Sequence, residues 1–390
     1  MDFELTDQQA AFRDAARQFS DNELAPRAAH WDEHQEFPRD AIAGAGELGF
    51  CGLYTPEEAG GLGLSRLDAS IVLEELARGC TSTTAFISIH NMATWMVGAY
   101  ANPQTRDALC PALAAGESLA SYCLTEPGAG SDAAALKTSA TKAEGGYVLN
   151  GTKAFISGAG DTDVLVVMAR VADGSGPRTG ASGISAFAVD AGAPGISYGR
   201  KEAKLGWNSQ ATRQVVFENA MVPAARLLGK EGEGFRIAMR GLDGGRVNIA
   251  ACSVGTAAAA VEQCRAYMSE RRAFGRTIGS FQALRFKLAD MATNLVASRQ
   301  MVRLAASKLD RGDADATVYC AMAKRFATDL CFDICNDALQ IHGGYGYIKE
   351  YPLERYLRDS RVHQILEGTS EIMRVIVARR LLLEGASEIL

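Results

Sequence analysis

Glu367 is the side chain of this sequence best suited to take up a proton. It lies in the segment Gln364-Ile-Leu-Glu-Gly-Thr-Ser-Glu371, after two apolar residues and before a glycine. A carboxylate beside apolar groups loses solvation, so its pKa rises and it becomes a useful base near neutral pH. The same segment also fits an acid that only complements the N-terminus of the following apolar helix, Ile372–Leu383, which Thr369 or Ser370 would cap.

A second stretch has the residue types of a ligand-wrapping loop. Ser121-Tyr-Cys-Leu-Thr-Glu-Pro-Gly-Ala-Gly-Ser-Asp132 combines two glycines, Gly128 and Gly130, with the hydroxyls of Thr125 and Ser131. Glycine lets the backbone approach a ligand closely, and hydroxyl and backbone N–H groups can bind its oxygen and nitrogen atoms. The alternative is a simple glycine turn.

Two common cofactor and metal motifs are absent from the sequence. It contains no G-x-x-x-x-G-K-[ST] and no H-E-x-x-H. A P-loop and a zinc protease site are therefore disfavoured. Cys331 and Cys335 are one helical turn apart without a histidine at ligand spacing, so no metal site is expected.

The elements that must position these residues change character twice. Residues 1–120 read as helical, beginning with a capping signal at Thr6 and Gln9. Residues 121–235 hold short β-like runs, and Asn150-Gly151 predicts a tight turn between two of them. From residue 236 the helical period returns. One stripe of residues seven apart indicates a helix-bundle seam: Phe281, Leu288, Leu295 and Val302. The middle region predicts a compact antiparallel barrel or sandwich.

Bulk composition narrows the class of protein. A chain of 390 residues is long enough for two or three domains, and its net charge of −6 disfavours nucleic-acid binding. The acidic N-terminus shows no secretory signal, and no apolar run is long enough to insert in a membrane. Nine irregularly spaced cysteines fit reduced thiols. We therefore expect a cytoplasmic protein, or a mitochondrial matrix protein if the chain is a mature eukaryotic one.

From end to end the sequence resembles the acyl-CoA dehydrogenase family. The resemblance implies an α+β fold with an N-terminal helical domain (1–120), a middle β-barrel or sandwich domain (121–235) and a C-terminal four-helix-bundle domain (236–390). It also implies bound FAD. Segment Tyr122 to Ser131, with Leu124, Thr125 and Gly130, would lie along the flavin, as would Phe155-Ile156-Ser157. Many relatives carry tryptophan where this chain has Phe155.

The resemblance assigns a further set of cofactor contacts to a neighbouring subunit and hence implies a homotetramer. Arg271 would contact the FAD diphosphate. The same cofactor would be reached by Phe274, Phe281, Gln282, Gln340, Gly343 and Gly344. Separately, the resemblance places Thr369 and Glu371 near the adenosine end of FAD. His342, a tempting base, is not used by the family, and a packed or capping histidine is the usual outcome.

By the same resemblance Glu367 is the catalytic base of an acyl-CoA α,β-dehydrogenation, and an electron-transferring flavoprotein accepts the electrons. Expected substrate contacts are Ser131, Leu242, Asp243, Arg246, Leu366, Gly368 and Arg379. Read without the resemblance, Asp243 and Arg246 would be a surface ion pair worth little.

Segments Leu242–Ser253, Leu288–Thr293 and Asp359–Gly368 resemble the members that act on short, α-branched thioesters. The expected reaction is isobutyryl-CoA to methacrylyl-CoA, a step of valine catabolism. A short straight-chain or 2-methylbutyryl-CoA substrate is the alternative.

Three other readings use the same fold. An acyl-CoA oxidase would usually be much longer, and a nitro-compound oxidase would carry Asp where this chain has Glu367. A DNA-associated relative would need a basic C-terminal surface, which the acidic balance opposes. A non-catalytic helical scaffold would lack FAD.

Overall fold

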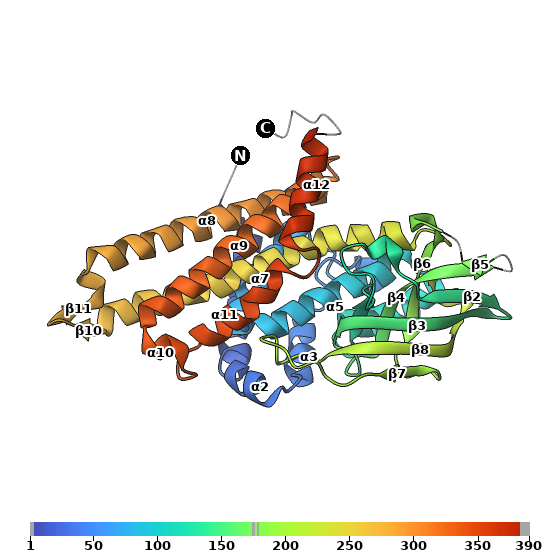
Figure 1. Ribbon diagram of the computed structural model, residues 1–390, viewed down its shortest axis with the longest axis horizontal. Coiled ribbons are helices and arrows are strands. Elements are labelled where there is room, and N and C mark those ends of the chain that lie inside the picture. The colour runs from blue at the N-terminus through green and yellow to red at the C-terminus, as the bar shows by residue number, and fades with distance from the viewer. Residues whose placement is uncertain (1–3, 174–175, 178, 383–390) are drawn as a thin grey trace.

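The computed structural model describes residues 4–173, 176–177 and 179–382, and it is elongated (Figure 1). Among the described residues, helices dominate the first and last regions of the chain and strands make up its middle. The change from helix to strand lies between α6 and β1, and the change back lies between β9 and α7. The predicted boundaries after residues 120 and 235 stay predictions.

The first helical region begins at the expected capping signal. The Thr6 hydroxyl accepts from the Gln9 N–H at 3.2 Å, and the side-chain oxygen of Gln9 accepts from the Thr6 N–H. A π-helical turn, Ser20–Leu24, and a 3₁₀ turn, Glu57–Ala59, interrupt the region. Its α-helices are α1 (Asp7–Phe19), α2 (Ala28–His34), α3 (Arg39–Glu47), α4 (Arg66–Gly79), α5 (Thr81–Tyr100) and α6 (Pro103–Ala114).

Among the described residues of the middle region, nine strands form one sheet with the path β7-β8-β3-β2-β4-β6-β9, while β1 and β5 pair with β4. Most pairs are antiparallel, as expected, but β1 and β2 run parallel to β4. The strands are β1 (Ala120–Cys123), β2 (Ser139–Ala143), β3 (Gly146–Ser157), β4 (Val164–Asp173), β5 (Gly176–Pro177), β6 (Ile184–Asp190), β7 (Ile196–Tyr198), β8 (Thr212–Pro223) and β9 (Leu227–Leu228).

The predicted tight turn at Asn150-Gly151 is wrong, because β3 runs through both residues. Asn150 bonds across to β8: its Oδ1 accepts from the Asn219 N–H at 2.9 Å. Gly151, at φ 145°, sits at a register shift, where a side chain would overlap Thr138. Here the glycine permits close packing of strands rather than a reversal of the chain.

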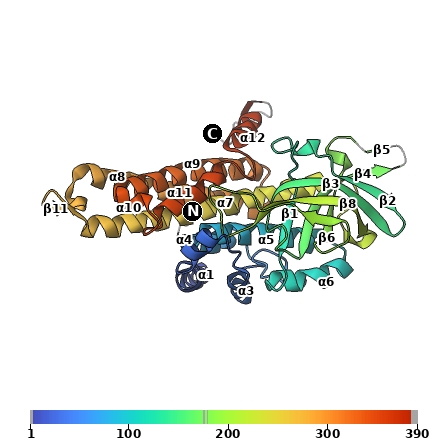
Figure 2. The same ribbon diagram turned by 60° about the horizontal axis from the view of Figure 1, so that its bottom comes forward.

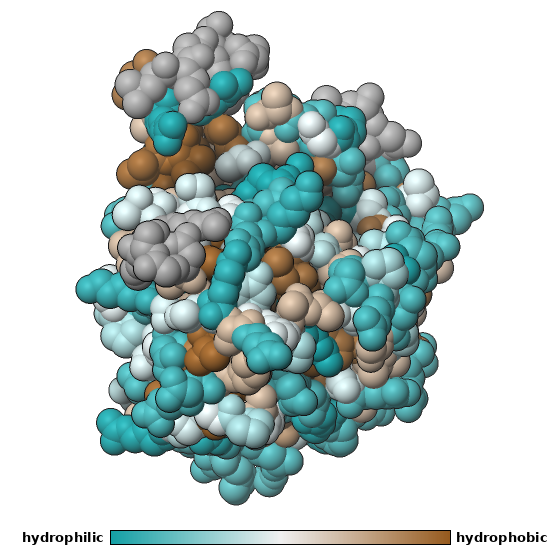
Figure 3. Space-filling view, turned by 90° about the vertical axis from the view of Figure 1, so that its right-hand side faces the viewer, coloured by the Kyte–Doolittle hydropathy of each residue, from teal (hydrophilic) through white to brown (hydrophobic). Residues whose placement is uncertain are grey.

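The strand β4 is buried on both of its faces. Val164, Val166 and Met168 pack with side chains of α5 and α7, whereas Leu165 and Val167 pack with β3 and β8. This alternation follows the two-residue period of a strand. At the sheet end the outer surface is mostly hydrophilic, with scattered hydrophobic side chains (Figure 3).

The C-terminal helices form a bundle around α7, a helix of 37 residues. It runs from the sheet along the bundle beneath α8 and α9 (Figures 1 and 2). The predicted seam lies in α8, where Leu295 and Val302 are buried. The elements are α7 (Gly234–Glu270), β10 (Arg272–Ala273), β11 (Arg276–Thr277), α8 (Gln282–Arg311), α9 (Ala316–His342), α10 (Gly344–Tyr347), α11 (Leu353–Arg361) and α12 (Ser370–Leu382).

Short 3₁₀ turns join several elements: Ala133–Ala135, Ala181–Gly183, Ala224–Arg226, Ile278–Ser280 and Val362–Gln364. The expected helix from Ile372 is α12, and its last expected residue, Leu383, lies outside the described residues. In the described part of the chain, no helix has the length and apolar character to cross a bilayer.

Candidate active site

The turn before α12 holds Glu367 in an unusual backbone conformation. Glu367 has φ 53° and Gly368 has φ 94°, so two successive residues are left-handed. Of the two expected caps of the helix, Thr369 and Ser370, it is Thr369 that makes the capping bond, because its Oγ1 accepts from the Ile372 N–H at 3.2 Å. A non-glycine residue in this region is strained and persists only when its surroundings fix it.

The Glu367 carboxylate points into the protein without a partner. Its Oε2 is buried and has no hydrogen-bond partner among the described residues. Burial raises the pKa of Glu367 to about 7, although the positive charges of Lys324 and Arg246 act in the opposite direction. A buried carboxylate with a free oxygen and a near-neutral pKa has the properties of a general base.

Helix α7 makes room for this carboxylate at Gly245. A methyl group built there would overlap Oε2 of Glu367 and lie 2.9 Å from its Cδ. The neighbouring Gly244 faces Arg66 in the same way, since a methyl group would lie 2.9 Å from the guanidinium carbon. Arg66 in turn lies 3.4 Å above the ring of Tyr54. The two glycines therefore let α7 pack directly against charged side chains.

The pair Asp243 and Arg246 is buried rather than a surface pair. Arg246 Nη1 lies 2.6 Å from Asp243 Oδ1, and the Thr317 hydroxyl donates to Asp243 Oδ2 at 2.7 Å. Arg246 Nε also donates to the Glu367 carbonyl at 3.5 Å. Burial raises the pKa of Asp243, and Arg246 opposes this. Both expected substrate residues thus lie beside the Glu367 turn, and Leu242 is buried one position before them.

Leu366 belongs to a small apolar cluster beside the base. It packs with Ala85, Ile89, Trp207, Ile249 and Val362. Behind the cluster, Trp207 Nε1 donates to His363 Nε2 at 3.3 Å, and His363 Nδ1 lies 2.6 Å from the Ser253 hydroxyl. Burial lowers the pKa of His363 to about 3, so this imidazole is neutral. The wall next to Glu367 is therefore apolar and closely packed.

The glycine-containing segment after β1 reaches the same region. The Tyr122 hydroxyl is buried without a partner in the described part of the chain, and burial together with the charge of Glu367 raises its pKa. Leu124 is buried, and the Thr125 carbonyl accepts from the Ala154 N–H at 2.9 Å. A methyl group on Gly128 or Gly130 would meet nothing within 4 Å, so these exposed backbones are open to a ligand. Ser131 is exposed next to them.

A bulge in β3 turns Phe155 outward. The pairing with β8 shifts between Lys153 and Ile156, and Phe155 has φ 57° and is 68% exposed. Ile156 is buried, and the Ser157 carbonyl accepts from the Ser121 hydroxyl at 2.7 Å. Bulges re-aim side chains next to binding sites. An aromatic face held outward beside open glycine backbones fits a flat ring system such as a flavin.

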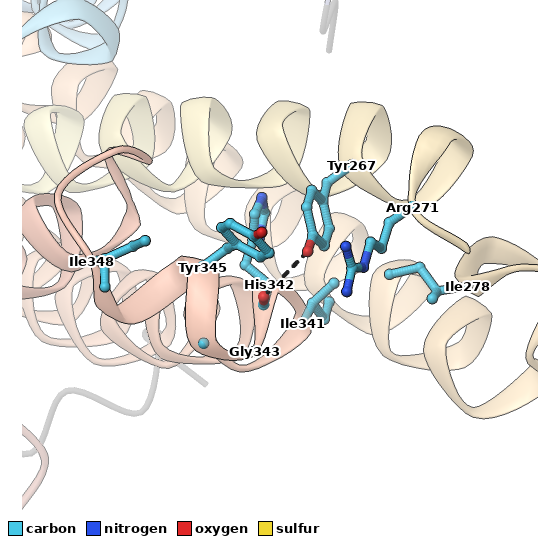
Figure 4. A pocket seen from close by; sticks show the side chains of 9 residues that line it. Tyr267, Arg271, Ile278, Ile341, His342, Gly343, Tyr345 and Ile348 are labelled. Atoms are coloured by element: carbon cyan, nitrogen blue, oxygen red, sulfur yellow. Dashed lines mark hydrogen bonds between the residues drawn. The ribbon is translucent and has the colours of Figure 1, made fainter. Parts of the chain in front are cut away.

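Arg271 lines a different pocket, of about 500 Å³, at the far end of α7 (Figure 4). Its guanidinium lies over the Tyr345 ring at 5.5 Å. Methyl groups on Gly343 and Gly344 would meet nothing within 4 Å. His342 stacks on Tyr267 at 4.2 Å, and its Nε2 has no partner among the described residues. A cation, stacked rings and open backbone could together hold a phosphorylated aromatic ligand.

The remaining expected cofactor residues divide between the two regions. Phe274 is 95% exposed at φ 51° in the β10–β11 hairpin, 6.1 Å from the Phe281 ring. Gln282 and Gln340 are exposed. That hairpin lies at the opposite end of the molecule from β3, whereas Glu371 and Arg379 are exposed on α12 (Figure 1). Within one chain, Tyr122, Leu366 and Glu367 therefore lie together, whereas Phe155 and Arg271 lie far from each other.

Sequence reasoning missed Lys324 and Gly245, which both contact the Glu367 turn. Lys324 is fully buried in α9, and its Nζ donates to the Gly368 carbonyl at 2.8 Å. A signal existed, because Lys324 stands at helical spacing between the apolar positions Ala321 and Ala327. Gly245 gave no signal, since its role depends on a residue 122 positions away.

Comparison with known proteins adds independent findings. Family models described as acyl-CoA dehydrogenase N-terminal, middle and C-terminal domains match residues 6–117, 121–220 and 232–382. The mitochondrial isobutyryl-CoA dehydrogenase of Bos taurus is 53% identical over 380 residues, which cover 97% of this chain and 90% of that protein.

Two solved structures are similar over nearly the whole chain. One, described as the electron transferring flavoprotein of Acidaminococcus fermentans, superposes with TM-score 0.94 at 40% identity, covering 98% of this chain and 100% of the other. PigA with FAD and proline superposes with TM-score 0.94 at 29% identity, covering 99% and 100%.

Proposed function

Because the chain belongs to the acyl-CoA dehydrogenase family, we propose that it converts isobutyryl-CoA to methacrylyl-CoA with bound FAD. The observation that carries the proposal is the Glu367 carboxylate, whose Oε2 is buried without a hydrogen-bond partner among the described residues and whose pKa is raised to about 7. The 53% identity to an isobutyryl-CoA dehydrogenase supports the branched substrate and a place in valine catabolism.

In this mechanism Glu367 removes the proton from the α-carbon of the thioester and holds it on its carboxylate. The acceptor for the hydride that leaves the β-carbon would be supplied by bound FAD. Negative charge then develops on the thioester oxygen and requires a donor placed in advance. The Glu367 backbone N–H has no acceptor among the described residues, so it is available to donate to that oxygen.

The residues that would hold FAD come from two subunits. In one subunit Tyr122, Phe155 and Ser157 would face the flavin, together with Leu124, Thr125, Gly130, Ser131, Ile156, Thr369 and Glu371. Arg271 and Phe274 lie at the opposite end of the molecule, beyond α7, which at ~1.5 Å per residue is about 55 Å long. They would therefore serve the cofactor of a neighbour, together with Phe281, Gln282, Gln340, Gly343 and Gly344.

A homotetramer is the proposed assembly. Besides the divided cofactor site, hydrophobic side chains are exposed on the bundle, among them Phe286 and Val296 on α8 and Val375 on α12. Exposed apolar side chains that gather in one patch mark surfaces that another protein covers, so these side chains are candidates for contacts between subunits. A solution measurement of mass would test the assembly.

The acyl group would lie between the flavin and Glu367, bounded by Leu366. Leucine is smaller than an aromatic side chain and leaves lateral room for an α-methyl group. Leu242, Asp243, Arg246 and Gly368, close to this turn, would follow the thioester and its arm. Ser131 and Arg379, exposed on other elements, would make outer contacts with the CoA portion.

We also propose an electron-transferring flavoprotein as the acceptor and no nucleic-acid partner. The described cysteines are all buried and unpaired, which supports a reducing compartment. That compartment would be the cytoplasm, or the mitochondrial matrix for a eukaryotic chain.

The deciding experiment is anaerobic bleaching of the flavin by a panel of thioesters: isobutyryl-, 2-methylbutyryl-, isovaleryl-, butyryl- and octanoyl-CoA. We expect the largest kcat/KM for isobutyryl-CoA, by roughly 10–200-fold at most over butyryl-CoA, because one methyl group is worth only ~1–3 kcal/mol. A maximum at octanoyl- or isovaleryl-CoA would reject the branched short-chain assignment. A purified protein that contains no flavin would reject the activity altogether.

A further inference from the structure

Lys324 is a fully buried cation beneath the catalytic turn. It lies in α9, and its ammonium donates to the carbonyl of Gly368, the residue that follows Glu367. Among the described residues it has no carboxylate oxygen within 4.0 Å. Burying a charge without a directly paired carboxylate is costly, so the position of Lys324 calls for an explanation beyond packing.

Several charged groups face Lys324 from every element around it. Glu367 and Glu371 face it from the turn and the start of α12, and Asp329 faces it from its own helix. Arg246 faces it from α7 and repels it, and the neutral His363 lies on the 3₁₀ turn before Ile365. Burial lowers the pKa of Lys324 to about 8, and Glu367 is the largest of the groups that raise it again. Glu367 is thus its main electrostatic counterpart.

The turn does not depend on Lys324 alone for its shape. Asp329, one and a half turns along α9, accepts from Gln364 Nε2 at 3.0 Å and from the Ser370 hydroxyl at 3.1 Å. These bonds fix the turn on both sides of Glu367. Asp329 and Lys324 both hold this turn from α9, but only Lys324 brings a positive charge to it.

We propose that Lys324 is a positioning residue for Glu367. Its ammonium anchors the Glu367–Gly368 turn, and its positive charge keeps the buried Glu367 carboxylate ionised so that it can accept the substrate proton. The proposal rests on the proposed function, because it assigns Lys324 a part in that reaction. Without the ammonium, Glu367 would hold its proton to higher pH, and the fraction of active base at neutral pH would fall.

The test compares Lys324→Gln, Lys324→Met and Lys324→Arg as FAD-containing holoenzymes. Anaerobic flavin reduction by isobutyryl-CoA is followed from about pH 6 to about pH 9, where the rate rises as Glu367 ionises. Lys324→Gln loses the charge but keeps a hydrogen-bond donor. In this variant we expect the rise of the reduction rate with pH to occur about one pH unit higher, with the maximal rate at high pH largely kept. At pH values below the rise, the rate should therefore be roughly tenfold lower than in the wild type. Lys324→Met should show the same shift with a lower plateau, and Lys324→Arg should restore the wild-type limb.

Asp329→Asn is the matched control, because it disturbs the same turn but removes negative charge. Its limb should stay in place or move to lower pH. A direct readout is the infrared band of the protonated Glu367 carboxyl, identified by its absence in Glu367→Gln. This band should persist to higher pH in Lys324→Gln.

The possible failures are distinguishable. If none of the thioesters in the panel reduces the flavin of the wild-type holoenzyme, the proposed function is wrong. If the wild type is active but the Lys324 variants lose rate equally at all pH values, with the infrared titration unmoved, Lys324 has only a structural role and the inference is overturned.

Discussion

The carboxylate of Glu367 lies against the α-carbon of Gly245, so closely that a single methyl group on the glycine would overlap Oε2. The two residues come from α7 and from the turn before α12, so the base is placed by the packing of two separate elements. Glycine inside a long helix is unfavourable by roughly 0.5–1 kcal/mol relative to alanine. Helix α7 therefore carries a glycine that is unfavourable for the helix itself, because only a glycine leaves room for the Glu367 carboxylate.

We expect Gly245→Ala to keep FAD but to lose flavin reduction by about 100-fold or more, because small displacements of a reacting group have effects of this size. Stopped-flow reduction by isobutyryl-CoA measures it. Gly44→Ala in α3 is the control, since a methyl group there meets the Phe19 ring at an ordinary 3.5 Å. Equal rates in both variants would show that Gly245 does not position the base.

Glu367→Gln should retain the FAD spectrum and bind acyl-CoA while flavin reduction falls by about 10²–10⁴-fold, the usual contribution of a general base. Glutamine keeps the shape and removes only the proton acceptor. Glu144→Gln, exposed between β2 and β3, should behave like the wild type. Near-normal reduction in Glu367→Gln would mean that another group takes the proton.

The same substitution should stabilise the protein at neutral and alkaline pH. Burial raises the folded-state pKa of Glu367 from 4.5 to about 7. As pH rises through this window the unfolded chain releases its proton before the folded chain does, so the free energy of unfolding falls, by about 3 kcal/mol in full. Thermal unfolding should show a larger gain in Tm for Glu367→Gln at pH 8 than at pH 5. A gain that does not depend on pH would contradict the assignment.

Leu366→Tyr should reduce kcat/KM for isobutyryl-CoA by roughly tenfold more than for butyryl-CoA. The larger ring would occupy the lateral space that we assign to the α-methyl group, next to Trp207 and Ile249. Leu366→Met, of similar volume, is the matched control and should change the ratio little. An unchanged ratio in the tyrosine variant would place the methyl group elsewhere.

Arg271→Ala should release FAD and weaken the tetramer together, because we assign Arg271 to the cofactor of a neighbouring subunit. Light scattering and the ratio of flavin to protein absorbance measure both quantities on one sample. Arg272→Ala is the control, since among the described residues the Arg272 side chain donates only to the Gly275 carbonyl of its own hairpin. A stable monomer with full FAD occupancy would refute the shared site.

The sequence predicted the helices well where signals are local. The Thr6–Gln9 capping box and the stripe through Leu295 depend on residues within one or two turns of each other, and both are present. Asn150-Gly151 misled for a physical reason. The asparagine side chain bonds across to Asn219 and the glycine admits Thr138, so tertiary contacts replaced the turn that the pair favours in isolation.

For the site, the resemblance pointed to Glu367 and to the segment around Tyr122, but local sequence could not reveal what surrounds them. Lysines on helices are usually exposed, so the apolar positions Ala321 and Ala327 were the local sign that Lys324 is buried, and nothing local placed it beneath the Glu367 turn. The Asp243–Arg246 pair has helical spacing in either environment, and only the packing of α7 against the Glu367 turn decides that it is buried. Contacts between elements far apart in sequence hold this information.

Phe155, Phe274 and Glu367 all have positive φ without being glycine. Each of these conformations is disfavoured in a free chain, so the fold has already lost the corresponding conformational freedom before any ligand arrives. A ligand meeting Phe155 and Glu367 on one subunit, and Phe274 of a neighbouring subunit, would find the backbone that carries two aromatic rings and a carboxylate already fixed. Its affinity would then be reduced little by ordering the protein, and association would resemble the closing of rigid surfaces more than the folding of a loop around a guest.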